Sequence, residues 1–410
     1  MRRIGIVTTW HDRGASYVSR QYEQLLRDAF EVYIYARGGY YARTDPDFNK
    51  YNVYWGKISG RPVSAALDIK DLLAWIRINA IDTVIFNEQA WWPPVIACNK
   101  AGIITGAYVD YYTKETIPLF AAYDFLLCNT KRHYGAFSWH SNAFYLPWGT
   151  ETDVYTPSRK ELYPECLTFF HSCGYSPERK GTDVFLRAAG SLTGRFQILI
   201  HTQKSLEEMG DEVNRIIDDL ERQGKLSIVT GTIKPPGLYT KGDVYVYPSR
   251  LDGIGLTLPE AISSGLAVVV TDHPPMNEFY NSDFGLNIPI VKQYSRQDGY
   301  YWDMVEPSIE FLHRHLQDMI DGRYDIDEMK RRARSYATRA LDWNKRKDEL
   351  VATVAKINKN ECGKVFDVIQ MISKYEDSRK SHLLKVYNTL PWLLEPILRI
   401  RRRIIRRVSL

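Results

Sequence analysis

The chain has 410 residues, of which 44% are hydrophobic and 25% are charged. This composition is typical of a globular protein, and the length suits two domains better than one core. The formal net charge of +5 is small for this size, which argues against a protein that binds nucleic acid over its whole surface.

Cysteine usage and apolar run lengths narrow the class of protein further. The five cysteines are an odd number without a C-x-x-C pair, so we expect neither a disulfide framework nor a zinc site, and a reducing cytoplasm is the default compartment. The apolar run near the N-terminus is too short for a signal peptide. No run of about 18 apolar residues predicts a membrane-spanning helix.

The first part of the chain alternates short apolar strands with amphipathic helical patterns. A strand is predicted at residues 3–9, a helix at 16–30 and a second strand at 31–36. Further strands are predicted at 82–86, 103–109 and 124–129. Continuous apolar strands separated by helical patterns are typical of a parallel sheet covered on both faces.

A proline-containing segment, residues 147–165, interrupts this alternation and is predicted to be a linker. The alternation then restarts, with strands predicted at 167–174, 195–202, 226–232, 243–249 and 266–272 and helices at 181–192 and 205–224. The sequence therefore predicts an α/β protein with two doubly wound domains that face each other across a cleft. We place these domains at residues 1–150 and 151–340.

The stretch DGIGLTLPE, residues 252–260, combines a glycine-containing turn, two carboxylates and the start of a helix. Backbone N–H groups in such a turn can approach a phosphate, and the helix dipole favours its negative charge. Carboxylates beside the turn would accept hydrogen bonds from the hydroxyls of a ribose or another sugar. The combination points to a sugar nucleotide. The alternative is a tight turn and an ordinary helix start, where Glu is favourable by about 0.3–1 kcal/mol.

Residues 242–279 resemble the retaining glycosyltransferases of the GT-B fold, in particular glycosyltransferase family 4, also described as glycosyl transferases group 1. The signature is an acidic residue, seven residues and then Glu, which Asp252 and Glu260 match, framed by Pro248, Ser249 and the apolar strand at 266–272. The segments at 174–189, 146–157 and 227–233 are similar to further parts of the family. The resemblance covers roughly residues 4–355 and implies two Rossmann-like domains, with a helix at 341–358 that returns to the first.

The resemblance assigns roles to individual residues. Glu260 would hold the ribose hydroxyls of the donor, Asp252 would contact the transferred sugar, and Lys180 would neutralise the diphosphate as it leaves. A fixed cation can stabilise that charge without a metal, so no cofactor is expected. Further donor contacts are expected at Gly14, Gly174, Arg179, Thr232, Ile233, Gly253, Gly255, Leu256 and Thr257, of which Gly255, Leu256 and Thr257 would receive the diphosphate through their backbone.

The sequence departs from the family pattern at three positions. Tyr175 replaces the Arg that usually follows Gly174. Arg179 is the candidate to substitute for this cation, against which stands its place next to Lys180, because neighbouring helix residues point to different faces. Asp252 is one carbon shorter than the usual Glu. Asp110 or Tyr111 stands where the family often has a catalytic His, so Asp110 is a further catalytic candidate.

The C-terminal segment, residues 359–410, is predicted to be a basic helical tail. Placed on a helix, residues 393–408 (Leu393–Val408) show an apolar stripe with most of their arginines away from it. A basic helix with an apolar face is typical of a segment that lies on an anionic membrane surface. The alternative is a helix docked on the protein itself or on a second subunit. Nucleic acid would attract the arginines but has no use for the apolar face.

These observations favour an enzyme that transfers a sugar from a nucleotide-sugar donor to a glycan or lipid-linked acceptor, with retention of configuration. We expect a hexosyltransferase-type activity at the cytoplasmic membrane face, in surface polysaccharide or glycolipid synthesis. The alternative is a catalytically decayed member of the fold that binds a nucleotide or glycan as a scaffold. A nicotinamide-dependent dehydrogenase is disfavoured, because no G-x-G-x-x-G follows a predicted strand.

Overall fold

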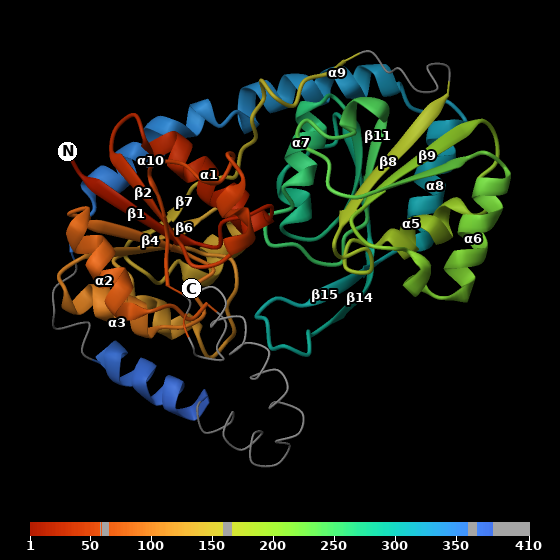
Figure 1. Cartoon of the computed structure of the whole chain (residues 1–410). Helices are drawn as coiled ribbons and strands as arrows, with labels where there is room; N and C mark the ends of the chain where they lie inside the picture. The colour runs from red at the N-terminus through yellow and green to blue at the C-terminus, as the bar shows by residue number, and fades with distance from the viewer. Residues whose placement is uncertain (58, 60–64, 159–165, 360–366, 380–410) are drawn as a thin grey trace. The chain divides into compact units, whose positions relative to one another are not determined.

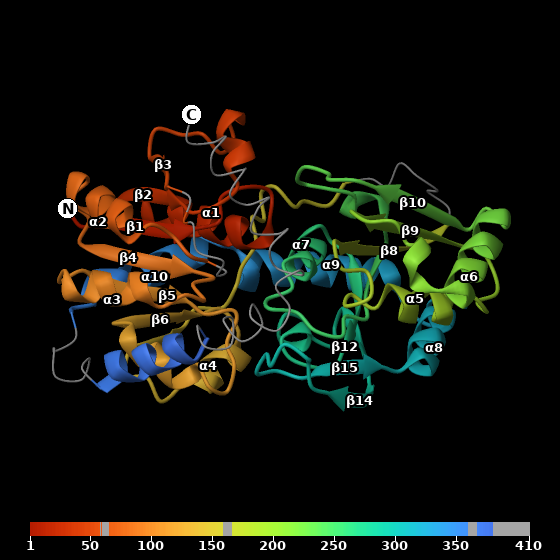
Figure 2. The same ribbon diagram turned by 60° about the horizontal axis from the view of Figure 1, so that its bottom comes forward.

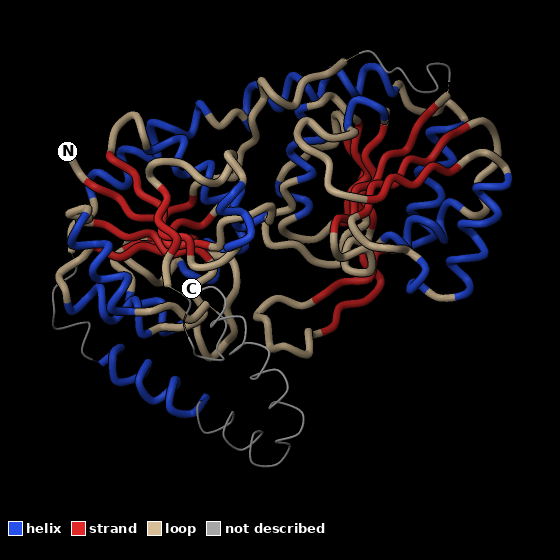
Figure 3. Tube along the Cα trace, viewed as in Figure 1, coloured by secondary structure: helices blue, strands red, loops and turns tan. Residues whose placement is uncertain are grey.

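The computed structural model describes residues 1–410 except 58, 60–64, 159–165, 360–366 and 380–410. The described chain forms two compact units, each with strands gathered in a central sheet and helices outside it (Figure 1, Figure 3). The first unit comprises Met1–Asn129, His133–Leu146 and the described residues from Lys347 on. The second comprises Thr130–Arg132 and Pro147–Arg346.

The first unit contains a seven-stranded parallel sheet in the order β3-β2-β1-β4-β5-β6-β7. Its strands are β1 (Arg3–Thr8), β2 (Glu31–Ala36), β3 (Val53–Trp55), β4 (Thr83–Asn87), β5 (Ile104–Tyr108), β6 (Phe125–Cys128) and β7 (Ala143–Tyr145). Its helices include α1 (Gly14–Leu26), α2 (Ile69–Ile78), α3 (Pro93–Lys100) and, from its third residue on, α4 (Lys131–Phe137). Strands β3 and β7 are the two edges and have three residues each, which is too short for a recognisable apolar pattern.

The second unit contains a six-stranded parallel sheet in the order β10-β9-β8-β11-β12-β13. Its strands are β8 (Leu167–Gly174), β9 (Phe196–Thr202), β10 (Leu226–Thr230), β11 (Val244–Tyr247), β12 (Ala267–Thr271) and β13 (Gly285–Ile288). Helices α5 (Thr182–Ala189), α6 (Asp211–Arg222) and α8 (Ile309–Ile320) cover one face, and α7 (Thr257–Ser263) and α9 (Ile326–Tyr336) cover the other (Figure 2). The predicted α/β class with two Rossmann-like domains is confirmed.

The apolar character of the central strands explains why they could be recognised in the sequence. Every residue of β11 and of β12 is buried, as expected for strands with neighbours on both edges and helices on both faces. In both units the strand order reverses direction beside the first strand, between β1 and β4 and between β8 and β11. Loops at the carboxyl ends of the strands at such a switch point are the usual place for a ligand.

A two-stranded antiparallel hairpin in the second unit was not predicted. It is formed by β14 (Ile290–Tyr294) and β15 (Met304–Pro307). Four of the five residues of β14 are exposed, so this strand lacks the buried apolar pattern that marks the strands of the sheet. The described part of the predicted linker, residues 147–158, contains no helix or strand.

The C-terminal part of the first unit continues beyond α10 (Asn344–Lys356), a helix that begins in the second unit. Residues 367–379 form a further helix, which buries Val368, Ile372 and Glu376. The Trp92 backbone N–H, at the start of α3, donates to the Glu376 carboxylate at 3.2 Å. The Arg379 guanidinium donates to the Ala90 carbonyl at 2.9 Å.

The predicted basic tail therefore has two parts. Its helix at 367–379 packs on the first unit, whereas the segment predicted to bind a membrane, residues 393–408, lies outside the described residues. Within the part of the chain that is described, we find no helix with the length and apolar character needed to cross a bilayer.

We expect Glu376→Ala to loosen the helix at 367–379. The substitution leaves the Trp92 N–H without its buried acceptor, and such a loss costs about 1–3 kcal/mol. Amide hydrogen exchange in residues 367–379 should accelerate about tenfold or more, as measured by mass spectrometry. Lys374→Ala, which truncates an exposed side chain of the same helix, should leave the exchange unchanged. Equal protection in wild type and Glu376→Ala would show that the carboxylate does not hold this helix.

Candidate active site

Two loops meet at the carboxyl edge of the second unit's sheet. The turn at 175–181 follows β8 and leads into α5, and the loop at 248–256 follows β11 and leads into α7. Strands β8 and β11 are neighbours, so their loops emerge side by side. Gly181 has φ +70°, and a Cβ there would lie 2.0 Å from the Pro248 carbonyl oxygen. Only glycine fits this close approach of the two loops.

Lys180, Arg179 and Asp252 converge where these loops meet. The Lys180 ammonium contacts Asp252 Oδ2, and Arg179 Nη1 lies 3.2 Å from Asp252 Oδ1. The Tyr247 hydroxyl also donates to Asp252 Oδ2. Lys180 and Asp252 are each only 9% exposed. Arg179 and Lys180 can reach the same carboxylate because both precede α5, which begins at Thr182, so the helical spacing that would separate them does not apply.

The charges of this cluster favour an anionic ligand. Burial alone raises the pKa of Asp252, but the Lys180 ammonium, the Arg179 guanidinium and hydrogen bonds from Lys180 and Tyr247 together lower it far below its ordinary value. Asp252 is therefore ionised at neutral pH and balances one of the two cations. Burial lowers the pKa of Lys180, whereas the Asp252 carboxylate acts to raise it. With both cations protonated, one positive charge is in excess beside the glycine-containing turn, which is an arrangement that suits a phosphate group.

Glu260 lies in the first turn of α7, in a different environment from Asp252. The Tyr239 hydroxyl donates to Glu260 Oε2 at 2.5 Å, and the Tyr155 hydroxyl also hydrogen-bonds to this carboxylate. Burial raises the pKa of Glu260 to about 7, although both tyrosines act in the opposite direction. A carboxylate held in this way can accept hydrogen bonds from a diol such as a ribose.

The three tyrosines around these carboxylates were missed by sequence reasoning. Tyr247 ends β11, and the period of two along a strand places it on the same face as Tyr245, whose ring stacks on it at 5.6 Å. This alternation in β11, the strand that leads into the motif, was the signal in the sequence that could have identified Tyr247. Tyr155 and Tyr239 come from the linker and a short helical turn, where no periodicity indicates their direction.

The other predicted donor residues of the second unit lie on the same edge of the sheet. Gly255 has φ +87°, and a Cβ there would lie 2.8 Å from the Tyr247 hydroxyl. Leu256 caps α7, Thr257 is its first residue, and an added Cβ at Gly253 would meet no atom within 4 Å. The remaining ones are Gly174, which ends β8 at φ +54°, and Thr232 and Ile233, which follow β10 two strands away from β8.

Gly14 and Asp110 belong to the first unit. Gly14 is the first residue of α1, after β1, and Asp110 follows β5. Burial and the nearby Glu88 carboxylate raise the pKa of Asp110 to about 7. Glu88 has φ +52°, which is uncommon for a residue with a side chain, and Arg37 donates to its carbonyl at 2.8 Å.

A polar cluster therefore occupies the carboxyl edge of the first unit's sheet. Arg13 completes it through an ion pair with Glu88 at 3.2 Å. Sequence reasoning missed Arg37 and Glu88, since their only signal is their place at the ends of strands: Arg37 directly follows β2, and Glu88 directly follows β4, which extends one residue beyond the predicted strand. Within the described residues, no group of three or more His, Cys, Asp or Glu side chains is arranged to hold a metal ion.

Comparison with known proteins places these features in a family context. Residues 167–291 match the model of the family described as Glycosyl transferases group 1. No curated protein matches the chain. The resemblance to glycosyl transferases group 1 is thus confirmed for the segment that contains Lys180, Asp252 and Glu260.

Solved glycosyltransferase structures share the fold of the chain. HepE (Alr3699) from Anabaena, in complex with UDP, is 14% identical with a TM-score of 0.67; the match covers 87% of this chain and 100% of that one. A glycosyltransferase from Rickettsia africae ESF-5 is 15% identical with a TM-score of 0.67, covering 88% and 99%. WaaG, a glycosyltransferase involved in lipopolysaccharide biosynthesis, is 14% identical with a TM-score of 0.62, covering 86% and 100%. The predicted GT-B fold is confirmed.

The raised pKa of Glu260 predicts a pH dependence of stability. The pKa is about 7 in the folded protein and 4.5 for an unperturbed Glu, so the folded state retains this proton between these values. The resulting stabilisation is fully present below about pH 4.5 and is lost as the pH rises through 7. Glu260→Gln cannot ionise, so we expect the melting temperature of the wild type to fall relative to this variant between pH 5 and pH 8.

Differential scanning calorimetry across this pH range measures the difference. Glu178→Gln, which neutralises an exposed carboxylate of the same unit, should give a curve parallel to that of the wild type. A parallel curve for Glu260→Gln would instead mean that Glu260 is already ionised near pH 5.

Proposed function

We propose that this protein is a retaining glycosyltransferase that moves a sugar from a nucleotide-sugar donor to a glycan or lipid-linked acceptor. The family match at residues 167–291 and the GT-B fold support a transferase of this kind. The observation that carries the proposal is the convergence of Lys180 and Arg179 on Asp252, beside the loop that leads into α7.

The chemistry of glycosyl transfer explains why two cations would be needed at this place. When the bond between the sugar and the diphosphate breaks, negative charge develops on the leaving nucleoside diphosphate. Lys180 and Arg179 would stabilise this charge together with the backbone of Gly255, Leu256 and Thr257, and we expect them to do so without a metal. Asp252 would hold the two cations in place and contact hydroxyls of the transferred sugar.

The remaining predicted residues divide between donor and acceptor. Glu260 would accept hydrogen bonds from the donor ribose, and Thr232 and Ile233 would lie near the base. Gly14 would approach the donor phosphates. Asp110, with a pKa near neutrality, would exchange a proton with the acceptor hydroxyl. HepE has been solved with UDP, which makes UDP the first nucleotide to test on this chain.

The C-terminal arginines suggest where the enzyme would work. Each arginine near an anionic membrane is worth up to about 1 kcal/mol, so the six arginines of residues 393–408 would hold the protein there reversibly. We therefore propose a peripheral location on the cytoplasmic membrane face, in surface polysaccharide or glycolipid synthesis, and no role in nucleic-acid binding.

We expect Lys180→Ala to weaken binding of UDP by about 10- to 100-fold, because the diphosphate loses a charge-assisted contact. Isothermal titration calorimetry measures the affinity, and turnover of UDP-sugars measures the activity. Lys204→Ala, which removes an exposed lysine after β9 in the same unit, is the matched control and should bind as the wild type does. Wild-type affinity in Lys180→Ala would refute the site. Binding without turnover of any sugar nucleotide would favour the decayed scaffold.

We expect a chain that ends at residue 392 to lose affinity for anionic vesicles. The full chain should sediment with vesicles that contain about one-third phosphatidylserine and be released by roughly 0.5 M salt, since salt screens the arginines. Neutral vesicles and duplex DNA at equal salt are the controls. Equal sedimentation of both chains, or stronger retention on DNA, would contradict the proposed membrane role.

A further inference from the structure

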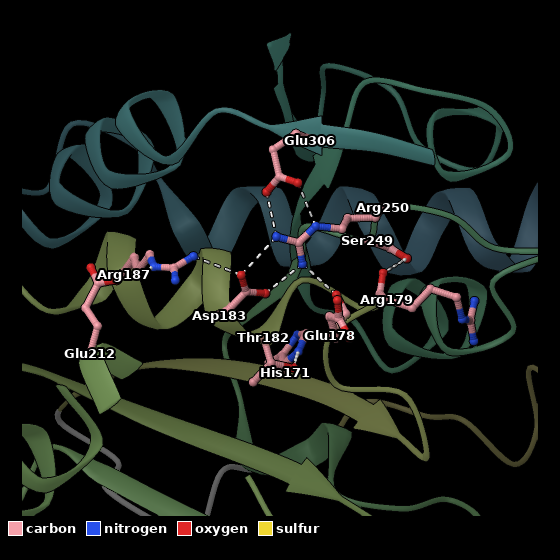
Figure 4. A network of polar contacts seen from close by, with 10 residues as sticks. All are labelled: His171, Glu178, Arg179, Thr182, Asp183, Arg187, Glu212, Ser249, Arg250 and Glu306. Carbon is pink, nitrogen blue, oxygen red and sulfur yellow. Dashed lines mark hydrogen bonds and ion pairs between the residues drawn. The ribbon is translucent and has the colours of Figure 1, made fainter. Parts of the chain in front are cut away.

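Arg250 follows Ser249 and precedes Asp252 by two residues in the loop after β11. Its side chain contacts carboxylates other than Asp252. Figure 4 shows its guanidinium between the carboxylates of Asp183 and Glu306. The side chain is only 8% exposed. Nη1 and Nη2 donate to the two oxygens of Asp183 at 2.7 and 2.9 Å, and Nε and Nη2 donate to those of Glu306 at 2.8 and 2.6 Å.

A fifth hydrogen bond runs from Nη1 to the Glu178 carbonyl at 2.6 Å. A guanidinium has five N–H donors in a fixed planar arrangement, and here each of them has an acceptor. A lysine has three donors at a single point and cannot pair with both carboxylates in this way.

The partners of Arg250 belong to three separate segments. Glu178 lies in the turn that carries Arg179 and Lys180, Asp183 lies in the first turn of α5, and Glu306 lies on β15 of the hairpin. The backbone makes the same connections, because the Arg250 N–H donates to the Arg179 carbonyl at 2.9 Å and the Val305 N–H donates to the Arg250 carbonyl at 3.0 Å.

These contacts fix the segments on either side of the cation pair. Lys180 lies between Glu178 and Asp183 in the chain, and both are bound by Arg250. Asp252 follows Arg250 by two residues, and the Arg179 side chain donates to the intervening Leu251 carbonyl at 2.6 Å. The Arg250 network therefore connects the turn that carries Lys180 to the loop that carries Asp252.

Stability alone is a weak reason for such a network. Removing an arginine and two carboxylates from water is costly, and apolar side chains of similar volume often stabilise a fold as well or better. A bidentate arginine supplies directional geometry that apolar packing lacks. Glu306 also lies beyond residues 167–291, so one of the two carboxylates comes from outside the segment that matches the family.

We propose that Arg250 is a positioning residue for the donor site: its ion pairs with Asp183 and Glu306 hold Lys180 and Asp252 at the separation that receives the donor diphosphate. The hairpin of β14 and β15 thereby contributes to the donor site through Glu306. This inference rests on the proposed function, because it requires that Lys180 binds the diphosphate.

Arg187 provides a matched control on the same carboxylate. It contacts Asp183 Oδ2 at 3.0 Å and Glu212 at 3.3 Å, but its side chain is 32% exposed and lies on the side of Asp183 away from Arg250 (Figure 4). Arg187→Lys therefore alters an ion pair of Asp183 without altering the connection to the loop of Asp252.

The test compares Arg250→Lys in two backgrounds, the wild type and Lys180→Ala. The dissociation constants of UDP and of inorganic pyrophosphate are measured by calorimetry, and the melting temperature is recorded for each variant. If Arg250 acts through Lys180, Arg250→Lys should weaken both ligands about tenfold in the wild type and less than twofold in Lys180→Ala. Arg187→Lys should change neither affinity by more than twofold.

The other outcomes separate this inference from the proposed function. An equal loss in both backgrounds, or no loss in either, would overturn the positioning role while leaving the role of Lys180 intact. An unchanged affinity in Lys180→Ala itself would overturn both. If Arg250→Lys does not fold, Glu306→Gln keeps the shape of the network but removes one charge, and about a threefold loss is expected from it, again only when Lys180 is present.

Discussion

The second unit's site depends on one buried anion. Asp252 is almost excluded from solvent, and a buried carboxylate is tolerated only when it is paired and hydrogen-bonded. Its partners Lys180 and Arg179 come from a different loop, so the pairing requires two loops in close contact. The sheet supplies that contact because β8 and β11 are neighbours at the point where strand order reverses, and Gly181 lets the turn approach Pro248 closely. The topology and one glycine together create the charge cluster.

The two carboxylates of the motif have opposite electrostatic environments although they lie in the same short segment. Asp252 faces two cations, which lower its pKa, whereas Glu260 accepts hydrogen bonds from tyrosine hydroxyls, and burial raises its pKa although these hydroxyls act in the opposite direction. The first is therefore a fixed negative charge that orders cations. The second is a hydrogen-bonding group whose charge changes near neutral pH. The surroundings, rather than the residue type, assign these two tasks.

Much of the fold and part of the site were predictable from the sequence. The buried central strands carry continuous apolar runs, and the spacing of Asp252 and Glu260 identified the loop at which Lys180 and Arg179 meet. Other features depend on contacts between distant segments. The exposed hairpin strand β14 has no buried face. The tyrosines around Glu260 come from irregular segments. Nothing in the sequence distinguishes Arg250 from other loop arginines, because its partner Glu306 is distant in the chain. The ligand roles of all these residues stay predictions.

The path of the chain has a consequence for how the protein is made. Leu350 and Val354 of α10 are fully buried, and Arg2 near the N-terminus donates to the Ile357 carbonyl at 3.0 Å. The first unit is therefore completed only by residues that follow the entire second unit, 147–346. At a synthesis rate of ~5–20 residues per second, this delay is roughly 10–40 s. During that interval the nascent first unit exposes the apolar surface that α10 later covers, which is the kind of surface that chaperones recognise on a ribosome-bound chain.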